Sequence, residues 1–142
     1  MTVGEFDCKL DAKNRFMLPS RLRNEIDGTI VITKSIDGKV LSIFEQTAFY
    51  SKYEEIKNSN LSSVKKNSLL RFLSSNSATL TLDQSGRILL PQNLKDYLGL
   101  CDNSIKVLGL FEKIEIWNPD EYKKQNGFDE AIKDLEDCGV LL

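Results

Sequence analysis

Two arginines occupy the same place in two matching short motifs, and their chemistry suits contact with a nucleic-acid base. The motifs read Asp11-x-x-x-Arg15 and Asp83-x-x-x-Arg87, and a Leu-Pro pair begins three residues after each arginine. An arginine guanidinium can donate two parallel hydrogen bonds to O6 and N7 of guanine in the major groove. Lys13 is two residues from Arg15, near enough to serve a neighbouring base or a phosphate.

The same spacing allows a structural role for the two arginines. Each aspartate lies four residues away, so an ion pair that stiffens the intervening turn is the alternative, and both roles can coexist. We expect Asp11 and Asp83 to form the turns and orient the arginines, because DNA repels a carboxylate. Arg21 and Arg23 fall in the next segment and suit phosphate contacts, which position a protein without specifying sequence.

The composition argues against catalysis and against a metal site. The 142 residues include no histidine, which excludes Ser-His-Asp triads, Cys-His dyads and mixed Cys/His zinc sites. Cys8, Cys101 and Cys138 are far apart and form no C-x-x-C pair, so we interpret them as small apolar fillers. Adjacent acids such as Glu54-Glu55 and Asp120-Glu121 are typical of solvated helix faces. We therefore expect a protein that is not an enzyme and holds no cofactor or metal.

The charge is distributed unevenly along the chain. The formal net charge is −2, but residues 1–75 carry twelve basic and nine acidic side chains, whereas residues 76–142 carry seven and twelve. Residues 9–23 hold five basic side chains against one acid, a local charge of +4 that favours an anionic partner. No apolar run approaches the roughly 20 residues of a membrane helix, and the N-terminus lacks the pattern of a signal peptide. We expect a cytoplasmic protein with no membrane partner.

An internal duplication explains why the motif occurs twice. Residues 10–23, LDAKNRFMLPSRLR, align without a gap with residues 82–95, LDQSGRILLPQNLK, at an offset of 72. Six of the fourteen positions are identical, where unrelated segments share about one. The match resumes at a slightly shifted offset, where residues 41–44 correspond to residues 114–117.

Each copy predicts the same succession of elements. Alternating apolar residues indicate a first strand at 6–10 and 78–82, and a polar turn follows. A proline ends the second strand, and a short helix comes next. The ranges predicted for the remaining elements are second strands at 15–18 and 87–90, helices at 20–26 and 92–98, and closing strand pairs at 29–33 with 40–44 and 105–109 with 114–117.

Helical segments lie between and after the two copies. Apolar residues at helical spacing predict helices at 48–56 and 64–75, and a last helix at 120–126, before an acidic and weakly amphipathic segment at 128–142. The resulting organisation is a first module at 5–47, a helical insert at 48–75, a second module at 76–119 and a C-terminal helical tail at 120–142. We expect the apolar stripes of the insert and tail to be core or subunit contacts.

These motifs resemble those of MraZ, a family of bacterial transcriptional regulators made of two SpoVT/AbrB-type modules in tandem. The segments that carry the resemblance are LDAKNRFMLPSRLR, LDQSGRILLP and the closing FEKIEIWNPDEY. The likeness spans essentially the whole chain, including the insert. It implies a β-dominated α+β fold in which two swapped-hairpin modules form a pseudo-dimeric barrel.

The resemblance also implies a function and a site. Members of the family form ring-shaped oligomers on the nucleoid that bind tandem short DNA repeats upstream of the division and cell-wall operon, through the loop that carries the motif. Carried over to this chain, the resemblance marks as the DNA-facing loops Asp11, Lys13 and Arg15 in the first copy and Asp83 and Arg87 in the second. With the arguments above, the expected DNA-binding residues are Lys13, Arg15, Arg87, Arg21 and Arg23, and the expected turn-orienting residues are Asp11 and Asp83.

The two loops depart from the family pattern in different ways. The first has Lys13-Asn14-Arg15 where Lys-Gly-Arg is usual, and the second has Ser85-Gly86-Arg87, with one positive charge fewer. We therefore expect the two loops to bind DNA unequally. The alternative function is an antitoxin-like protein-interaction module, since AbrB-type folds also occur in antitoxins, and purification with a bound partner protein would distinguish it.

Overall fold

The computed structural model describes residues 1–36, 38–125 and 127–141. Residue 37 of the predicted segment 5–47, and residues 126 and 142 of the predicted tail, lie outside the described residues. The strands are β1 (Thr2–Lys9), β2 (Arg15–Met17), β3 (Thr29–Lys34), β4 (Val40–Glu45), β5 (Ser77–Thr81), β6 (Arg87–Leu89), β7 (Ser104–Phe111) and β8 (Lys113–Trp117). The helices are α1 (Ser20–Arg23), α2 (Gln46–Lys57), α3 (Ser63–Ser75), α4 (Gln92–Leu98), α5 (Pro119–Lys123) and α6 (Phe128–Asp137).

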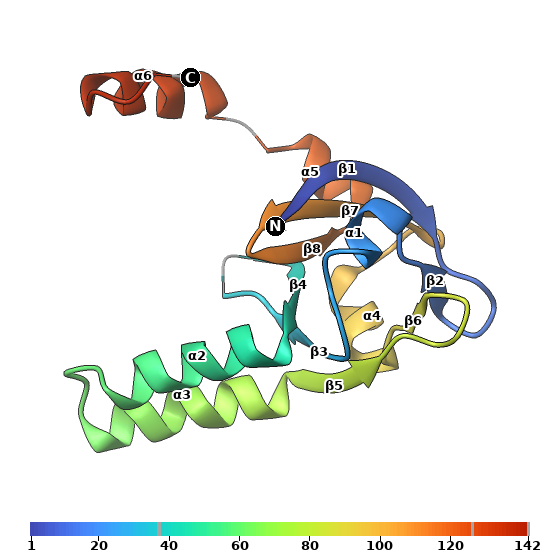
Figure 1. Ribbon diagram of the computed structural model, residues 1–142, viewed down its shortest axis with the longest axis horizontal. Coiled ribbons are helices and arrows are strands. Elements are labelled where there is room, and N and C mark those ends of the chain that lie inside the picture. Colours follow the sequence, from blue (N-terminus) through green and yellow to red (C-terminus); the bar gives the residue numbers. More distant parts are fainter. Residues whose placement is uncertain (37, 126, 142) are drawn as a thin grey trace.

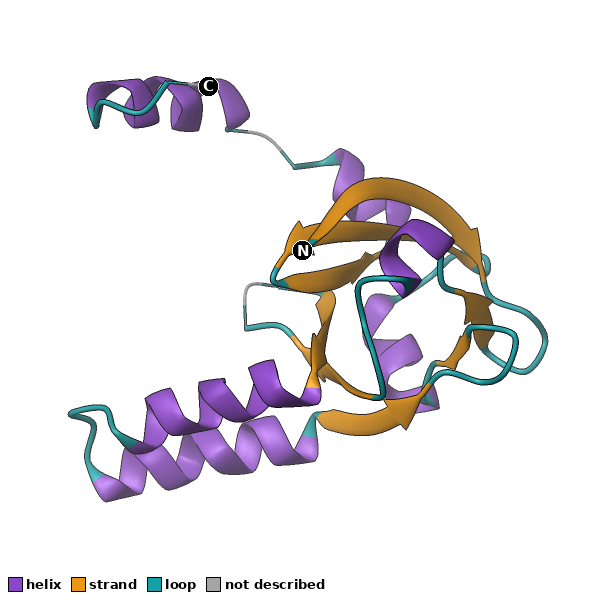
Figure 2. Ribbon diagram, in the orientation of Figure 1, coloured by secondary structure: helices purple, strands orange, loops and turns teal. Residues whose placement is uncertain are grey.

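The main sheet is antiparallel, and its strands are exchanged between the two copies. Its order is β1-β7-β8-β4-β3-β5, so the first strand of each copy pairs with the third strand of the other copy. β4 and β8, which occupy equivalent places in the two copies, pair with each other at the centre. Exchanging the labels of the two copies leaves this order unchanged. The fold is therefore α+β and rich in strands (Figure 2). The symmetric strand order is the pseudo-twofold arrangement that a duplication produces.

A closed barrel is not found among the described residues. β1 and β5 each pair along one edge only, so the hydrogen-bonded sheet is open. A separate two-stranded ribbon, formed by β2 and β6, lies at the end of the molecule where both polar turns emerge (Figure 1). The barrel implied by the family resemblance is thus replaced by a six-stranded sheet and a two-stranded ribbon.

The core is built from the same positions of each copy. The pairs at the offset of 72 that are at most 1% exposed are Phe16 with Ile88, Leu18 with Leu90, and Leu22 with Leu94. The prolines that precede α1 and α4 have the extended backbone that ends a strand, and each accepts the first bonds of the following helix. α4 matches its predicted range and ends at Gly99 in a left-handed conformation. α1 is shorter than predicted, because residues 25 and 26 continue it with i→i+3 bonds.

Four of the described helices bury no residue of their own in the single chain: the short α5, and three longer ones. The three longer ones are α2 and α3, which form an antiparallel hairpin, and α6, which stands apart from the sheet (Figure 1). The prediction of a weakly amphipathic tail is wrong for α6. Phe128, Ala131, Ile132 and Leu135 share one face at helical spacing, opposite a face rich in acids. No helix of the described residues is long and apolar enough to cross a membrane.

Candidate nucleic-acid interface

Each polar turn is closed by its aspartate in the same way. Oδ1 of Asp11 accepts hydrogen bonds from the backbone N–H groups of Lys13 (2.8 Å) and Arg15 (2.9 Å). Oδ1 of Asp83 accepts equivalent bonds from Ser85 and Arg87, both at 2.9 Å. These bonds fix the short loop in one conformation, so the direction of each arginine is set by main-chain geometry.

Each arginine side chain forms an ion pair with the aspartate of its own turn. Nε of Arg15 lies 3.2 Å from Oδ2 of Asp11, and Nε of Arg87 lies 2.8 Å from Oδ2 of Asp83. The ion pair expected as the structural alternative is therefore present in both turns. Among the described residues neither guanidinium makes a hydrogen bond through its Nη atoms. The edge of the guanidinium formed by the two Nη atoms is thus free for a ligand while Nε holds the side chain in place.

The same contacts keep the two carboxylates ionised. The hydrogen bond from the Arg15 backbone amide is the largest cause that lowers the pKa of Asp11 below its ordinary value of 3.8. The hydrogen bond from the Arg87 backbone amide does the same for the pKa of Asp83. Each turn is therefore held by a charged acceptor at neutral pH.

The two arginines lie on one face of the β2–β6 ribbon. The antiparallel register places Arg15 opposite Leu89 and Met17 opposite Arg87, so these four side chains share a face. About half of Met17 and of Leu89 is exposed on that face, whereas the opposite face of the ribbon belongs to the core. Arg15 and Arg87 stand on a diagonal of the ribbon, about 7–8 Å apart at their Cα atoms. The sequence predicted both strands but not their pairing, because periodicity assigns the faces of a strand and not its partner.

A lysine that the sequence analysis did not select reaches the first turn from the second copy. Nζ of Lys95, on α4, donates a 2.8 Å hydrogen bond to Oδ1 of Asn14. Nδ2 of Asn14 donates to Oε1 of Gln92, on the same helix, at 2.9 Å. The internal repeat could have identified Lys95, because this residue aligns with Arg23 at the offset of 72.

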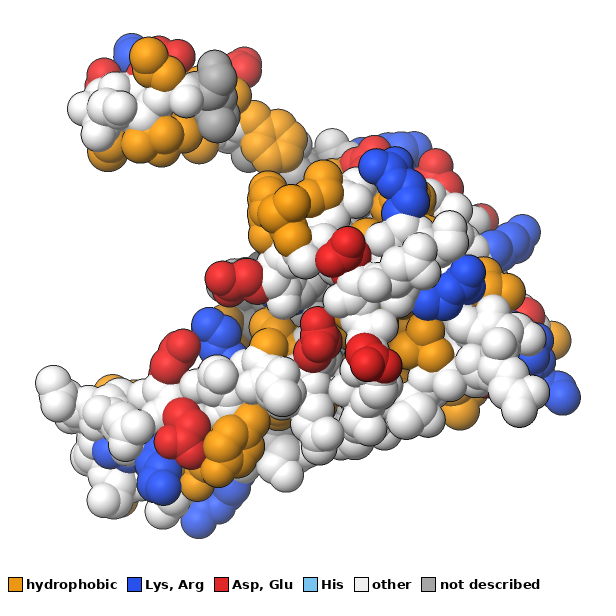
Figure 3. All heavy atoms as spheres, in the orientation of Figure 1, with side chains coloured by type: hydrophobic (Ala, Val, Ile, Leu, Met, Phe, Trp, Pro, Cys, Tyr) orange, Lys and Arg blue, Asp and Glu red, His pale blue; other side chains and the backbone are white. Residues whose placement is uncertain are grey.

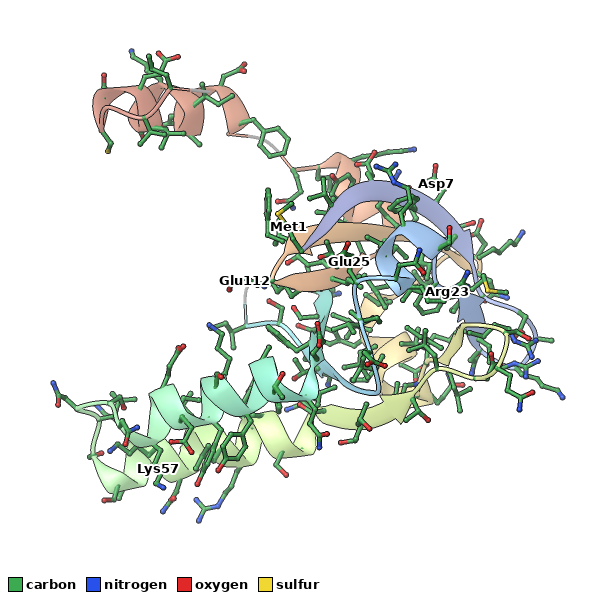
Figure 4. The ribbon with its side chains drawn as sticks, viewed as in Figure 1. Met1, Asp7, Arg23, Glu25, Lys57 and Glu112 are labelled. Carbon is green, nitrogen blue, oxygen red and sulfur yellow. The ribbon has the colours of Figure 1, made fainter. Side chains whose placement is uncertain are left out.

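Arg23 makes the reciprocal contact with the second turn. A Cβ atom added to Gly86 would lie 2.3 Å from Nη1 of Arg23, so this side chain covers the glycine. Nη1 of Arg23 also donates to Sδ of Met17 (3.3 Å) and to the carbonyl of Leu18 (3.4 Å). Figure 4 labels Arg23 on the α1 side of the ribbon. The fold therefore places Arg23 against the loop of the other copy, and its expected phosphate contact stays a prediction.

The remaining two predicted cations lie apart from each other. Lys13 is exposed in the first turn. The guanidinium of Arg21 lies 5.9 Å from the centre of the Phe6 ring, above β1. The fold thus brings Lys13, Arg15, Arg87 and Arg23 to the ribbon and its turns, and it leaves Arg21 on α1 against β1. Figure 3 shows several Lys and Arg side chains at the end of the molecule that carries the turns.

The described residues give no sign of a metal centre, since no group of three or more Cys, Asp or Glu side chains there is placed to hold an ion. The three cysteines are all free, and two of them, Cys101 and Cys138, are exposed. Burial of Cys8 raises the pKa of its thiol, with the charge of Asp7 adding to the effect.

Comparison with known proteins extends over the whole chain. A family model described as "MraZ protein, putative antitoxin-like" matches twice, at residues 1–72 and 73–134. A protein of Clostridium beijerinckii named "Transcriptional regulator MraZ" is 32% identical over 144 residues, which covers 99% of this chain and all of the relative. A protein of the same name from Roseiflexus sp. is 35% identical over 119 residues, 84% of this chain and 82% of the relative.

Proposed function

The chain belongs to the MraZ family, and from that premise we propose that it is a DNA-binding transcriptional regulator whose β2–β6 ribbon reads bases in the major groove. The observation that carries the proposal is the diagonal pair of arginines on the exposed face of the ribbon. The major groove admits a two-stranded β-ribbon, and a bidentate arginine–guanine contact discriminates by about 1–3 kcal/mol. Two arginines about 7–8 Å apart span about two base steps of 3.4 Å.

Cations around the ribbon supply the contacts that are independent of sequence. Lys13 extends from the first turn and Arg23 lies at the base of the second, where both suit phosphate contacts, whereas Lys95 is bound to Asn14. Arg21 lies farther along α1 and suits a phosphate contact beyond the ribbon. Phosphate contacts give affinity and register, and they make the affinity fall as salt rises.

One pair of arginines is too little to single out an operator in a genome, so we propose that several chains act together. Linked sites add binding free energy through their effective concentration. In this proposal a ring-like oligomer, built from chains with SpoVT/AbrB-type modules at 5–47 and 76–119, binds tandem short repeats upstream of the division and cell-wall operon. The protein would then work in the cytoplasm, on the nucleoid.

The helices without buried residues support this assembly. Apolar side chains remain exposed on the α2–α3 hairpin, at Tyr50 (59%), Val64 (79%) and Phe72 (38%), and on α6, at Phe128 (68%) and Ile132 (43%). The charges of the two surfaces are complementary, because α3 carries three basic residues and no acid, whereas α6 carries five acids and one lysine. We propose that α6 of one chain packs on the hairpin of the next. An interface between two different patches closes into a ring when its rotation permits.

The experiment that tests DNA recognition is a titration of a fluorescent duplex from upstream of the protein's own gene, with a scrambled duplex of equal length for comparison. The expected result is tight binding to the native duplex alone, with an affinity that falls as salt rises. The variant Arg15→Ala is expected to lose this preference and keep the oligomer. Lys123→Ala is the matched control, because Lys123 is an exposed cation on α5, outside the ribbon and outside the surfaces proposed for assembly. Equal affinity of the wild-type protein for both duplexes would refute the proposal.

The assembly is tested separately by the mass of the particle in solution. Ile132→Asp places a charge in the apolar face of α6 and is expected to give a smaller particle. Ile36→Asp is the control, since Ile36 is 80% exposed and lies outside both surfaces. An unchanged mass for Ile132→Asp would exclude α6 from the interface.

A protein-interaction function is the second candidate, favoured by the words "putative antitoxin-like" in the description of the family model. In that case the exposed face of α6 would hold a partner protein. Purification with a stoichiometric partner, lost in Ile132→Asp and retained in Arg15→Ala, would favour this candidate over DNA recognition.

A further inference from the structure

We propose that each arginine turn is positioned by a cation from the opposite copy: Lys95 positions the first turn and Arg23 positions the second. The consequence for DNA reading rests on the proposed function, whereas the positioning itself does not. Lys95 and Arg23 align in the duplication, and the two contacts cross between the copies in opposite directions.

The first contact occupies the whole side chain of Asn14. Its Oδ1 accepts from Lys95 and its Nδ2 donates to Gln92, so both ends of the amide are bound to α4. Gln92 in turn donates to Asp96 at 2.8 Å, which anchors the network within the helix. An asparagine amide can read adenine through this same pair of groups. Because both polar atoms of the amide are bound to α4, we infer that Asn14 links the first turn to that helix.

The backbone conformation of Asn14 explains why its bonds to α4 affect the direction of Arg15. Asn14 has φ +59°, a left-handed conformation that is unfavourable for most residues other than glycine and is tolerated by asparagine. Its carbonyl accepts from the N–H of Leu90 in the other copy at 2.8 Å. The next residue is Arg15, so a change in the Asn14 backbone would redirect the reading side chain.

The second turn uses packing where the first uses hydrogen bonds. Gly86 also has positive φ, and its carbonyl accepts from the N–H of Leu18 at 3.1 Å. With no side chain at this position, the guanidinium of Arg23 lies directly against the glycine. Each turn therefore has the same main-chain anchor, supplemented by a cation suited to the residue it meets.

Positioning is tested first without DNA, by amide hydrogen exchange. Lys95→Ala is expected to speed the exchange of the Lys13 and Arg15 amides and to leave those of Ser85 and Arg87 unchanged. Arg23→Ala is expected to do the reverse, and Lys95→Arg to restore slow exchange at the first turn. Lys123→Ala is the control, since Lys123 is exposed on α5, outside the turns and outside the surfaces proposed for assembly. Equal changes at both turns, or no change, would overturn the proposal.

The DNA titration then separates positioning from direct contact. Lys95→Ala is expected to lower the ratio of specific to scrambled affinity about five- to tenfold, the effect of one charge-assisted hydrogen bond at a half-exposed site. The salt dependence of the affinity should stay the same. The double variant Asn14→Gly with Lys95→Ala should lower the ratio of specific to scrambled affinity no further than the more damaging of the two single variants. If the slope of log affinity against log salt concentration became smaller in magnitude by about 0.9 while the ratio of specific to scrambled affinity stayed unchanged, Lys95 would be a phosphate contact and positioning would be refuted. If the wild-type protein prefers no DNA, the proposed function fails while hydrogen exchange still decides the positioning.

Discussion

The first and second turns are held by the same contacts, but the residues between the aspartate and the arginine differ. In both, the aspartate accepts two backbone N–H groups and holds the arginine through Nε. The position before the arginine has positive φ in both, at +59° for Asn14 and +81° for Gly86. The differences are the charge of Lys13 against the neutral Ser85, and an amide against no side chain at the next position.

This contrast separates the residues that build a turn from those that distinguish one turn from the other. The Asp–Arg pair repeats because the loop conformation needs it. The residues between them are free to change as long as the left-handed position keeps a residue that tolerates it. The duplication has therefore given one ribbon two related arginine turns with unequal charge.

The largest expected effect tests whether the two turns are one structural unit. Phe16 and Ile88 lie opposite each other across the ribbon and are at most 1% exposed. We expect Phe16→Ala to lower the free energy of unfolding by about 3–5 kcal/mol, and Ile88→Ala by about 2–5 kcal/mol, measured by chemical denaturation. Each variant should also speed amide exchange in both turns. If amide exchange became faster only in the turn of the mutated copy, the two turns would be independent.

The next effect compares the two arginines in DNA binding. Arg15→Ala and Arg87→Ala are each expected to cost about 1–3 kcal/mol of discrimination per chain, which adds up over an oligomer on repeated sites. We expect the larger loss for Arg15→Ala, because Lys13 reinforces the first turn and the second turn has Ser85. Titration of the native and scrambled duplexes measures both losses. Equal losses would mean that the extra charge does not bias recognition.

The sequence predicted most of the elements around the turns, because those predictions rest on local patterns. The alternation in 6–10, the proline after each second strand and the glycine after α4 all act within a few residues of where they lie. The amphipathicity of α6 was underestimated, although the spacing of Phe128, Ile132 and Leu135 was visible in the sequence.

The arrangement between the copies could not be predicted in the same way. Nothing local to residue 15 indicates that β2 pairs with β6, or that Lys95 bonds to Asn14 across 81 positions of sequence. The segment 9–23 was therefore interpreted as one basic patch, whereas the fold turns Arg23 toward the second loop. Exchange of strands between copies makes sequence proximity a poor guide to which cations act together.

A smaller effect is expected when the left-handed residues are exchanged between the turns. Gly86→Asn adds a Cβ atom 2.6 Å from Cδ of Arg23, so Arg23 must move and lose its contacts with Met17 and Leu18. We expect a loss of about 1 kcal/mol in the free energy of unfolding. Asn14→Gly keeps the conformation, so its cost should be less, about 0.5–1 kcal/mol from the lost bonds and the freer unfolded chain. Thermal and chemical denaturation of both variants checks this order, and a more damaging Asn14→Gly would reverse the comparison.

The smallest effect concerns pH, because both aspartates are exposed and water screens their interactions. Their pKa values are lower in the folded chain than the ordinary 3.8, so each stabilises the fold above that value, and the stabilisation is lost as pH falls through the folded pKa. Asp11→Asn and Asp83→Asn should each lower stability at pH 7 and match the wild-type protein at low pH. Since the arginine backbone amide is the largest cause in both turns, Arg15→Ala should leave the pKa of Asp11 still below 3.8 in a carboxyl NMR titration. A return to 3.8 in that variant would show that the guanidinium, and not the main chain, holds the first turn.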